Sequence, residues 1–208
     1  MEITVKKFVV GPLQTNAYVV YELPAKNAII IDPGDIDERI DNFIQMENLT
    51  PLAILLTHGH FDHIMGVEHY AKIYKIPVFI HKLDEPMLYN PSLNHSQFFG
   101  TPFKLSAEAN SLTQECFVEI GPFKIQVIET PGHTKGSVCY LLDNLLFSGD
   151  TLFLDTIGRT DFPESLPEKM KDSLRKLTNL DPEITLHPGH MGSGKLKIAR
   201  NLNPFLKI

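Results

Sequence analysis

Residues 57–63 read Thr57-His58-Gly59-His60-Phe61-Asp62-His63 and follow a short apolar segment at Leu52 to Leu56. Four side chains able to bind a metal lie within this stretch: His58, His60, Asp62 and His63. Imidazole and carboxylate groups suit zinc, iron or manganese, and no cysteine stands among them. A loop between a strand and a helix can turn two of these side chains toward one point and two toward another. The spacing therefore predicts two adjacent metal ions rather than one.

Three further positions extend this pattern, each after a predicted strand and directly after a glycine: His133, Asp150 and His190. An aspartate after glycine more often caps a turn or a helix. Beside so many histidines, however, Asp150 is the natural carboxylate to bridge two cations. A histidine-rich surface loop is the alternative, but burying these groups without a metal would leave costly polar atoms unpaired.

Apolar periodicity predicts an α/β protein of the α+β type, with two sheets packed face to face and helices outside. Predicted strands cover 3–10, 17–21, 28–31, 52–56, 78–80, 116–120, 123–129, 137–142, 145–148 and 184–186. One predicted helix begins after Asp35 or Asp37, where Ile36, Ile40, Phe43 and Ile44 recur at helical spacing. The other predicted helices cover 66–74, 81–88, 167–177 and 195–202. Residues 90–115 break the pattern and are predicted to be an irregular loop that borders the site as a lid. At 208 residues the chain suits a single domain, residues 1–208.

Composition excludes several classes of protein. Acidic residues outnumber basic ones, for a formal net charge of −6, so a nucleic-acid partner is not expected. No apolar segment is long enough to span a membrane, and no signal peptide is recognisable, so we expect a cytoplasmic protein. Cys116 and Cys139 are expected to be buried free thiols of a reducing compartment, although a disulfide between them stays open.

Five separated motifs resemble those of metallo-β-lactamase-fold hydrolases, and especially the glyoxalase II-like (hydroxyacylglutathione hydrolase-like) group. They are Thr15-Asn16-Ala17-Tyr18 with Ile31-Asp32-Pro33-Gly34, the 57–63 motif, His133, Gly149-Asp150-Thr151-Leu152-Phe153 with Gly158-Arg159-Thr160-Asp161, and His190. The resemblance covers nearly the whole chain and implies a four-layer αββα sandwich.

The same resemblance implies the role of each ligand. His58, His60 and His133 would hold one metal, Asp62, His63 and His190 the other, and Asp150 would bridge them. The resemblance implies two divalent ions, with zinc favoured over iron or manganese. They would supply a hydroxide that attacks a small-molecule thioester. Asp62 and Asp150 are thus the candidate catalytic carboxylates, and the oligomeric state stays open.

Arg159 matches a position where glyoxalase II-like enzymes carry a basic residue that can contact the substrate carboxylate. An equal alternative is a loop arginine paired with Asp155 or Asp161. Asp32 is expected to accept a hydrogen bond from a ligating imidazole. His187 is interpreted as a supporting or structural residue, and the histidines without a motif are interpreted as ordinary polar residues: His69, His81 and His95.

Two departures separate this chain from full-length glyoxalase II enzymes. Those enzymes carry a further helical domain that grips glutathione, so the resemblance is to a short form without it. They also resemble one another in having a tyrosine where Asp161 stands. Three alternatives therefore stay open: a persulfide dioxygenase with one iron on His58, His133 and Asp150, a lactonase or β-lactamase, and a non-catalytic metal-binding or redox module.

Overall fold

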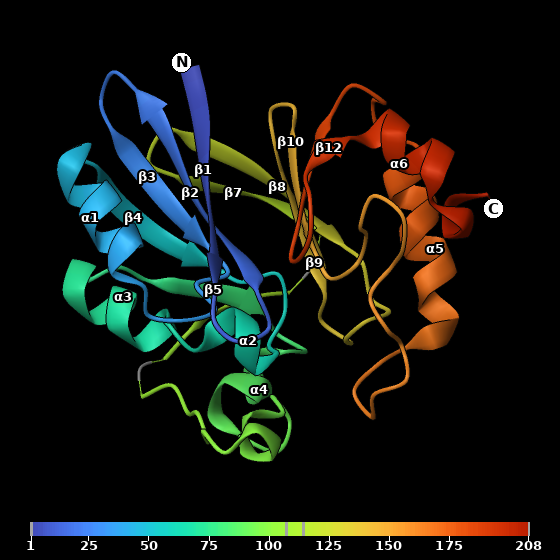
Figure 1. Ribbon diagram of the computed structural model, residues 1–208, viewed down its shortest axis with the longest axis horizontal. Coiled ribbons are helices and arrows are strands. Elements are labelled where there is room, and N and C mark those ends of the chain that lie inside the picture. The colour runs from blue at the N-terminus through green and yellow to red at the C-terminus, as the bar shows by residue number, and fades with distance from the viewer. Residues whose placement is uncertain (1, 107, 114, 208) are drawn as a thin grey trace.

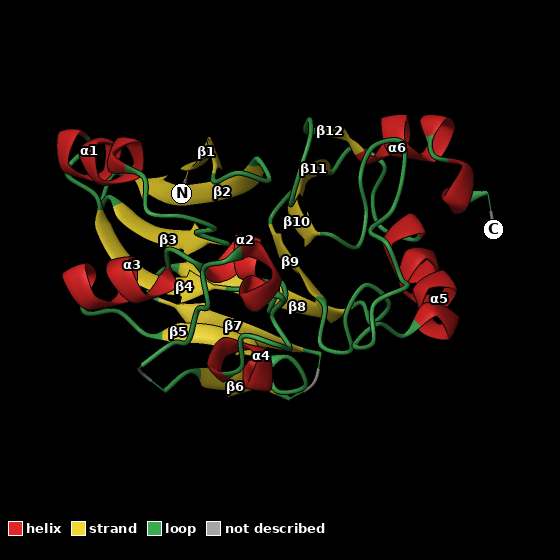
Figure 2. Ribbon diagram, turned by 60° about the horizontal axis from the view of Figure 1, so that its bottom comes forward, coloured by secondary structure: helices red, strands yellow, loops and turns green. Residues whose placement is uncertain are grey.

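The computed structural model describes residues 2–106, 108–113 and 115–207. These residues form two sheets that pack against each other, with helices on both outer faces (Figure 1). Figure 2 shows the layers from another side, with α1 and α3 at one end and α5 and α6 at the other. The predicted αββα sandwich is confirmed.

The element bounds follow the predicted ranges closely. The strands are β1 (Glu2–Val10), β2 (Thr15–Leu23), β3 (Asn27–Ile31), β4 (Thr50–Leu55), β5 (Val78–His81), β6 (Asn110–Leu112), β7 (Cys116–Ile120), β8 (Phe123–Glu129), β9 (Val138–Leu142), β10 (Leu145–Gly149), β11 (Thr185–Pro188) and β12 (Gly194–Lys195). The helices are α1 (Glu38–Met46), α2 (Phe61–Ile64), α3 (Val67–Tyr74), α4 (Glu85–Tyr89), α5 (Pro167–Thr178) and α6 (Leu196–Leu202), with short 3-10 helices η1 (Ser96–Phe99) and η2 (Pro204–Leu206).

Strand pairing brings the predicted ligand loops together. The first sheet has the order β1-β2-β3-β4-β5-β6 and the second the order β12-β11-β10-β9-β8-β7. β3 and β4 are parallel, as are β10 and β11. Because the carboxyl ends of parallel strands meet at one edge, the loop after β3 lies beside the loop after β4, and Asp150 lies beside the loop that carries His190.

Alternating side chains build three apolar layers. Along β3, Ile29 and Ile31 pack between the two sheets, whereas Ala28 and Ile30 pack beneath the helices of the first sheet. A third cluster joins the outer face of the second sheet to α5 and α6. Period-2 alternation with both faces buried explains why the strands are continuous apolar runs in sequence.

Three local predictions need correction. The helix predicted over 81–88 begins at Glu85, because His81 still belongs to β5. The stretch 90–115 is not wholly irregular, since it contains η1 and the edge strand β6. Ile36 lies outside α1 and is exposed, because Asp37 caps that helix by accepting from the Arg39 backbone N–H.

The two cysteines were both expected to be buried, but they lie in different environments. Cys116 and Cys139 are both free; Cys139 is buried, as expected, and Cys116 is only half-buried. Within the described parts of the chain, no helix has the length and apolar character needed to cross a membrane.

Candidate metal centre

All seven predicted ligands converge at one edge of the sandwich. His58 and His60 follow β4, Asp62 and His63 lie in the first turn of α2, and the others stand on separate loops: His133, Asp150 and His190. His60 stands at the N-cap of α2 with extended backbone, and the short helix that follows carries Asp62 and His63, with the His63 ring centroid 4.1 Å from that of His58. His58 is shared between groups, because its ligand atom also lies within 4.8 Å of those of His63 and Asp150.

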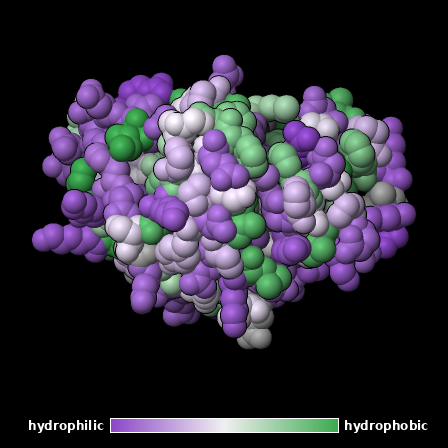
Figure 3. Space-filling view, turned by 90° about the horizontal axis from the view of Figure 1, so that it is seen from below, coloured by the Kyte–Doolittle hydropathy of each residue, from purple (hydrophilic) through white to green (hydrophobic). Residues whose placement is uncertain are grey.

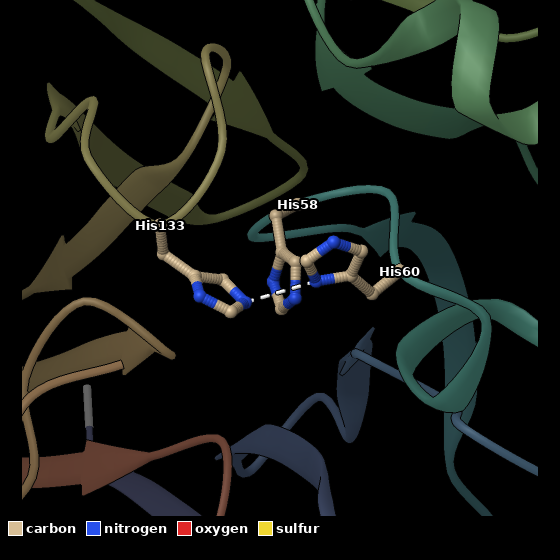
Figure 4. A group of neighbouring side chains, drawn as sticks. All are labelled: His58, His60 and His133. Atoms are coloured by element: carbon tan, nitrogen blue, oxygen red, sulfur yellow. Dashed lines mark hydrogen bonds between the residues drawn. The ribbon is translucent and has the colours of Figure 1, made fainter. Parts of the chain in front are cut away.

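The first cluster consists of His58, His60 and His133, whose ligand atoms all lie within 4.8 Å of one another. Figure 4 shows the three rings pointing toward one another from two loops. His60 Nδ1 lies 2.9 Å from His133 Nε2, and all three residues are buried. Three converging imidazoles are a common first coordination shell for zinc.

The second cluster consists of Asp62, His63 and His190, again with ligand atoms within 4.8 Å of one another. Asp62 Oδ2 lies 3.2 Å from His190 Nε2 and 3.5 Å from His63 Nε2. This mixed carboxylate and imidazole set also suits a divalent cation.

Asp150 lies between the two clusters. Its Oδ2 is 3.5 Å from His190 Nε2 and 3.7 Å from His133 Nε2, and its Oδ1 is 3.4 Å from His63 Nε2. One carboxylate thus faces members of both clusters, which is the position of a bridging ligand.

Unpaired polar atoms test whether these residues fit metal ions. His58 Nε2, His63 Nε2 and Asp150 Oδ1 are buried and have no hydrogen-bond partner. Buried polar atoms are rarely left without partners, because each costs free energy of folding. The described residues hold three other such atoms, Asn16 Oδ1, His187 Nε2 and Arg200 Nε, which lie outside the ligand set. Metal coordination accounts for the three that belong to the predicted ligands.

The electrostatics of the clusters also favour cations. Burial lowers the pKa of His133 to about 4, so its ring is neutral and can coordinate at pH 7. Burial opposes a charge on His190, yet its hydrogen bonds to Asp150 and Asp62 raise its pKa to about 9. The carboxylates thus create a field that holds a positive charge, and a divalent ion can replace that proton.

Asp32 supports the centre as the sequence predicted. Its Oδ2 lies 3.0 Å from His63 Nδ1 and accepts from Thr57 Oγ1 at 2.6 Å, and its Oδ1 accepts from the Thr57 backbone N–H at 2.8 Å. A carboxylate on Nδ1 orients the ring and leaves Nε2 free to coordinate.

Glycines allow the ligand loops to approach closely. A Cβ on Gly34 would lie 1.7 Å from the Asp62 carbonyl oxygen, and one on Gly158 would lie 1.9 Å from that of Asp150. Both glycines belong to the quoted motifs, so the motifs specify close packing as well as ligands.

Asp84 is a supporting residue that the sequence analysis missed. It is buried and accepts from the Gly59 backbone N–H at 3.1 Å, from Thr134 Oγ1 at 2.6 Å and from the Gly136 backbone N–H at 2.7 Å. It therefore joins the His58–His60 loop to the loop after His133. No metal motif contains it, and an aspartate before a helix resembles an ordinary N-cap.

Asp84→Asn is expected to destabilise the protein by about 1–3 kcal/mol, because at least one buried donor then faces an amide N–H. Urea unfolding of both proteins measures this difference. The matched control is Asp172→Asn, which alters an exposed carboxylate on α5 that pairs with Arg175. Equal stability of the Asp84 variant and the parent would contradict the bracing role.

Glu164 and His95 are also part of the site, although His95 was interpreted as an ordinary polar residue. Glu164 Oε1 lies 3.0 Å from His60 Nε2 and also contacts His95 Nε2. Since His60 Nδ1 faces His133, Glu164 binds the opposite ring nitrogen and orients the ring. A glutamate far along the chain carries no sequence signal for this contact.

Glu164→Gln is expected to weaken zinc binding by about 10-fold to 100-fold, because the neutral amide accepts more weakly from the His60 ring. Competition with a chelator of known affinity measures the change. Glu168→Gln is the matched control, since Glu168 is exposed in the first turn of α5. An unchanged zinc affinity would show that the Glu164 contact does not tune the centre.

A cavity of about 610 Å³ opens over both clusters. Its lining includes the predicted ligands His60, Asp62, His133, Asp150 and His190. A volume of this size is typical of small-molecule sites. The ligand clusters are thus open to a substrate.

Arg159 also lines the cavity, but its guanidinium makes two hydrogen bonds to Asp161, at 2.7 and 2.8 Å. The pairing with Asp161 that the sequence left open is therefore present. The remaining histidines outside the clusters have local partners: His187 packs on Tyr18 and Phe147, His69 pairs with Asp41, and His81 pairs with Glu129.

Comparison with known proteins gives the family. Residues 10–190 match the metallo-beta-lactamase superfamily. The chain belongs to this superfamily. The probable metallo-hydrolase YqgX of Bacillus subtilis is 36% identical over 205 residues, which cover 97% of this chain and 96% of that protein. Hydroxyacylglutathione hydrolase GloC of Haemophilus influenzae is 30% identical over 202 residues, with 95% of each chain covered.

Solved structures of the superfamily agree with the fold. BLEG-1 B3 metallo-beta-lactamase has a TM-score of 0.94 and 39% identity, covering 99% of this chain and 100% of that one. TTHA1623 in a di-iron-bound form has a TM-score of 0.86 and 36% identity, covering 97% and 100%. The histidine and aspartate clusters thus stand in a fold whose relatives bind metal.

Proposed function

We propose that this superfamily member is a thioester hydrolase that works with two divalent metal ions, most simply zinc. The observation that carries the proposal is the position of Asp150 between two clusters, together with the lack of hydrogen-bond partners at His58 Nε2, His63 Nε2 and Asp150 Oδ1. His58, His60 and His133 would hold one ion, and Asp62, His63 and His190 the other. The likeness to hydroxyacylglutathione hydrolase GloC supports a thioester as the substrate.

The bound ions would supply a hydroxide near neutral pH and Lewis acidity for the carbonyl oxygen. The protein's own residues hold the reacting groups in position. Asp62 accepts a hydrogen bond from Thr15 Oγ1 at 2.9 Å, and it lines the cavity, where its carboxylate can accept a hydrogen bond from the attacking hydroxide and orient it. Burial raises the pKa of Asp62, but the charge of His63 and the hydrogen bond to His190 lower it to about 2, so it is ionised.

The overall reaction adds water to the thioester, breaks the carbon–sulfur bond and releases a carboxylic acid and a thiol. The cavity provides an entrance for the substrate above the clusters, and His133 is fixed by its Nδ1, which lies 2.7 Å from the Arg159 carbonyl oxygen. No serine or cysteine nucleophile is needed.

The experiment is elemental analysis of the purified protein together with an assay of thiol release. Zinc-loaded protein is expected to contain two ions per chain and to release thiol from S-lactoylglutathione or a neutral thioester. Chelated protein is expected to be inactive, and added zinc is expected to restore activity. A fully metal-loaded protein that cleaves no thioester would overturn the proposal.

Cleavage of a β-lactam ring is a second candidate, favoured by the likeness to BLEG-1 B3 metallo-beta-lactamase. The same ligands and cavity can serve amide cleavage, since fold does not fix substrate. A chromogenic cephalosporin assayed beside the thioesters distinguishes the two activities. A kcat/KM that is higher for the cephalosporin than for every thioester would favour the lactamase.

A further inference from the structure

The cavity above the two clusters has aromatic walls. Phe98 and Phe99 come from η1, and Phe162 lies in the loop that carries Arg159. The other apolar lining residues are Leu13, Phe61, Phe153, Ile157 and Met191. The lining is therefore mainly apolar outside the ligands.

Several of these side chains are exposed although they are large and apolar. Phe98 is 69% exposed, Phe99 54% and Met191 60%. Figure 3 shows a face on which apolar side chains form small patches between polar ones. Exposed apolar groups at the entrance of a cavity stabilise a ligand by being covered when it binds.

The aromatic wall is also held in place. Phe99 stacks on Phe61 with ring centroids 4.4 Å apart, and Phe61 directly follows His60. His95, beside η1, packs on Phe162 with ring centroids 4.6 Å apart and contacts Glu164. His95 thus contacts aromatic rings from both segments, and these contacts hold the apolar lining in place beside the ligands.

The cavity also has few basic side chains in its lining. Among the described lining residues, Arg159 is the only lysine or arginine. Asp161 accepts two hydrogen bonds from the Arg159 guanidinium and offsets its charge. The same guanidinium lies 4.2 Å from the centre of the Phe162 ring. An anionic substrate that pairs with Arg159 would lie beside the Asp161 carboxylate, whose negative charge opposes it.

We propose that this site selects neutral thioesters with an apolar chain next to the carbonyl over anionic S-acylglutathione thioesters. This inference rests on the proposed thioesterase function and specifies its substrate. An apolar chain gains by covering the aromatic wall, whereas the carboxylates of glutathione meet no unpaired lysine or arginine among the described lining residues. The apolar chain can belong to the acyl group or to the thiol, and the experiment distinguishes these.

The test measures kcat/KM of zinc-loaded protein on two series of thioesters. One series has a constant N-acetylcysteamine thiol and acetyl, butanoyl, hexanoyl and octanoyl groups; the other has a constant acetyl group and alkyl thiols of increasing length. In the favoured series, each buried methylene is expected to raise kcat/KM about fourfold. The series that rises identifies the half of the substrate that contacts the wall.

Phe98→Ala is expected to lower kcat/KM for the longest substrate by about tenfold and to change the shortest little, since an aromatic contact is lost only where the chain reaches it. Phe117→Ala is the matched control, because Phe117 is a similarly exposed phenylalanine on β7 that does not line the cavity. Its chain-length profile is expected to equal that of the parent.

Asp161→Asn tests the charge argument. Freeing Arg159 is expected to raise kcat/KM for S-lactoylglutathione about two- to fivefold at low salt, with the gain lost at high salt, and to leave neutral thioesters unchanged. A parent enzyme that prefers S-lactoylglutathione to every neutral thioester, or a flat profile in both series, would overturn the inference while leaving the thioesterase intact. Cleavage of no thioester at all would instead overturn the thioesterase proposal, and this inference with it.

Discussion

Asp150→Asn is expected to lower kcat/KM of the protein by about 1,000-fold or more. A metal ion stabilises the transition state by several kcal/mol, and each 1.36 kcal/mol changes the rate about tenfold. Asp150 lies within 3.7 Å of imidazole nitrogens in both clusters, so the neutral amide weakens the binding of both ions. Steady-state kinetics and elemental analysis of the same preparation measure the two effects together.

Asp143→Asn is the matched control for this substitution. Asp143 is exposed in the turn between β9 and β10 and has a φ of 51°, a conformation that asparagine adopts as readily as aspartate. We expect the control to keep full activity and metal content. An Asp150 variant that retains its metal and more than about a tenth of its activity would exclude the bridging role, since a lost ion costs far more than tenfold.

The ligands were predictable from the sequence because each stands in a short local motif after an apolar strand. Strand ends and glycines together restrict where such side chains can lie, and His133, Asp150 and His190 meet because of strand pairing. The fold was predictable because a continuous apolar run marks β3 and alternating burial marks β8, whereas the short edge strand β6 has neither signal.

Asp32 was predictable from its motif, but the supporting residues Glu164 and Asp84 were not. Glu164 meets His60 across 104 residues of sequence, and Asp84 meets Gly136 across 52. Such contacts depend on how loops pack, and a glutamate or an aspartate in a loop looks the same whether it is solvated or buried. His95 shows the error most clearly, because it was interpreted as an ordinary polar residue and lines the cavity.

His190→Ala is expected to reduce the metal content from two ions per chain to one and to lower kcat/KM for thioesters by about 100- to 1,000-fold. His190 belongs to the second cluster, where its Nε2 lies 3.2 Å from Asp62 Oδ2, while the first cluster keeps all of its imidazoles. The variant therefore separates the two sites within one folded protein.

The same variant decides between the hydrolase and the single-iron dioxygenase that the sequence left open. A dioxygenase would use His58, His133 and Asp150, so loss of His190 would leave its metal content and its oxygen consumption on a persulfide unchanged. His69→Ala is the matched control, since His69 is a half-buried histidine of α3 that pairs with Asp41 and belongs to neither cluster. If both variants keep the metal content and activity of the parent, the second cluster has no catalytic role, because a working ion cannot lose a ligand without a change in rate.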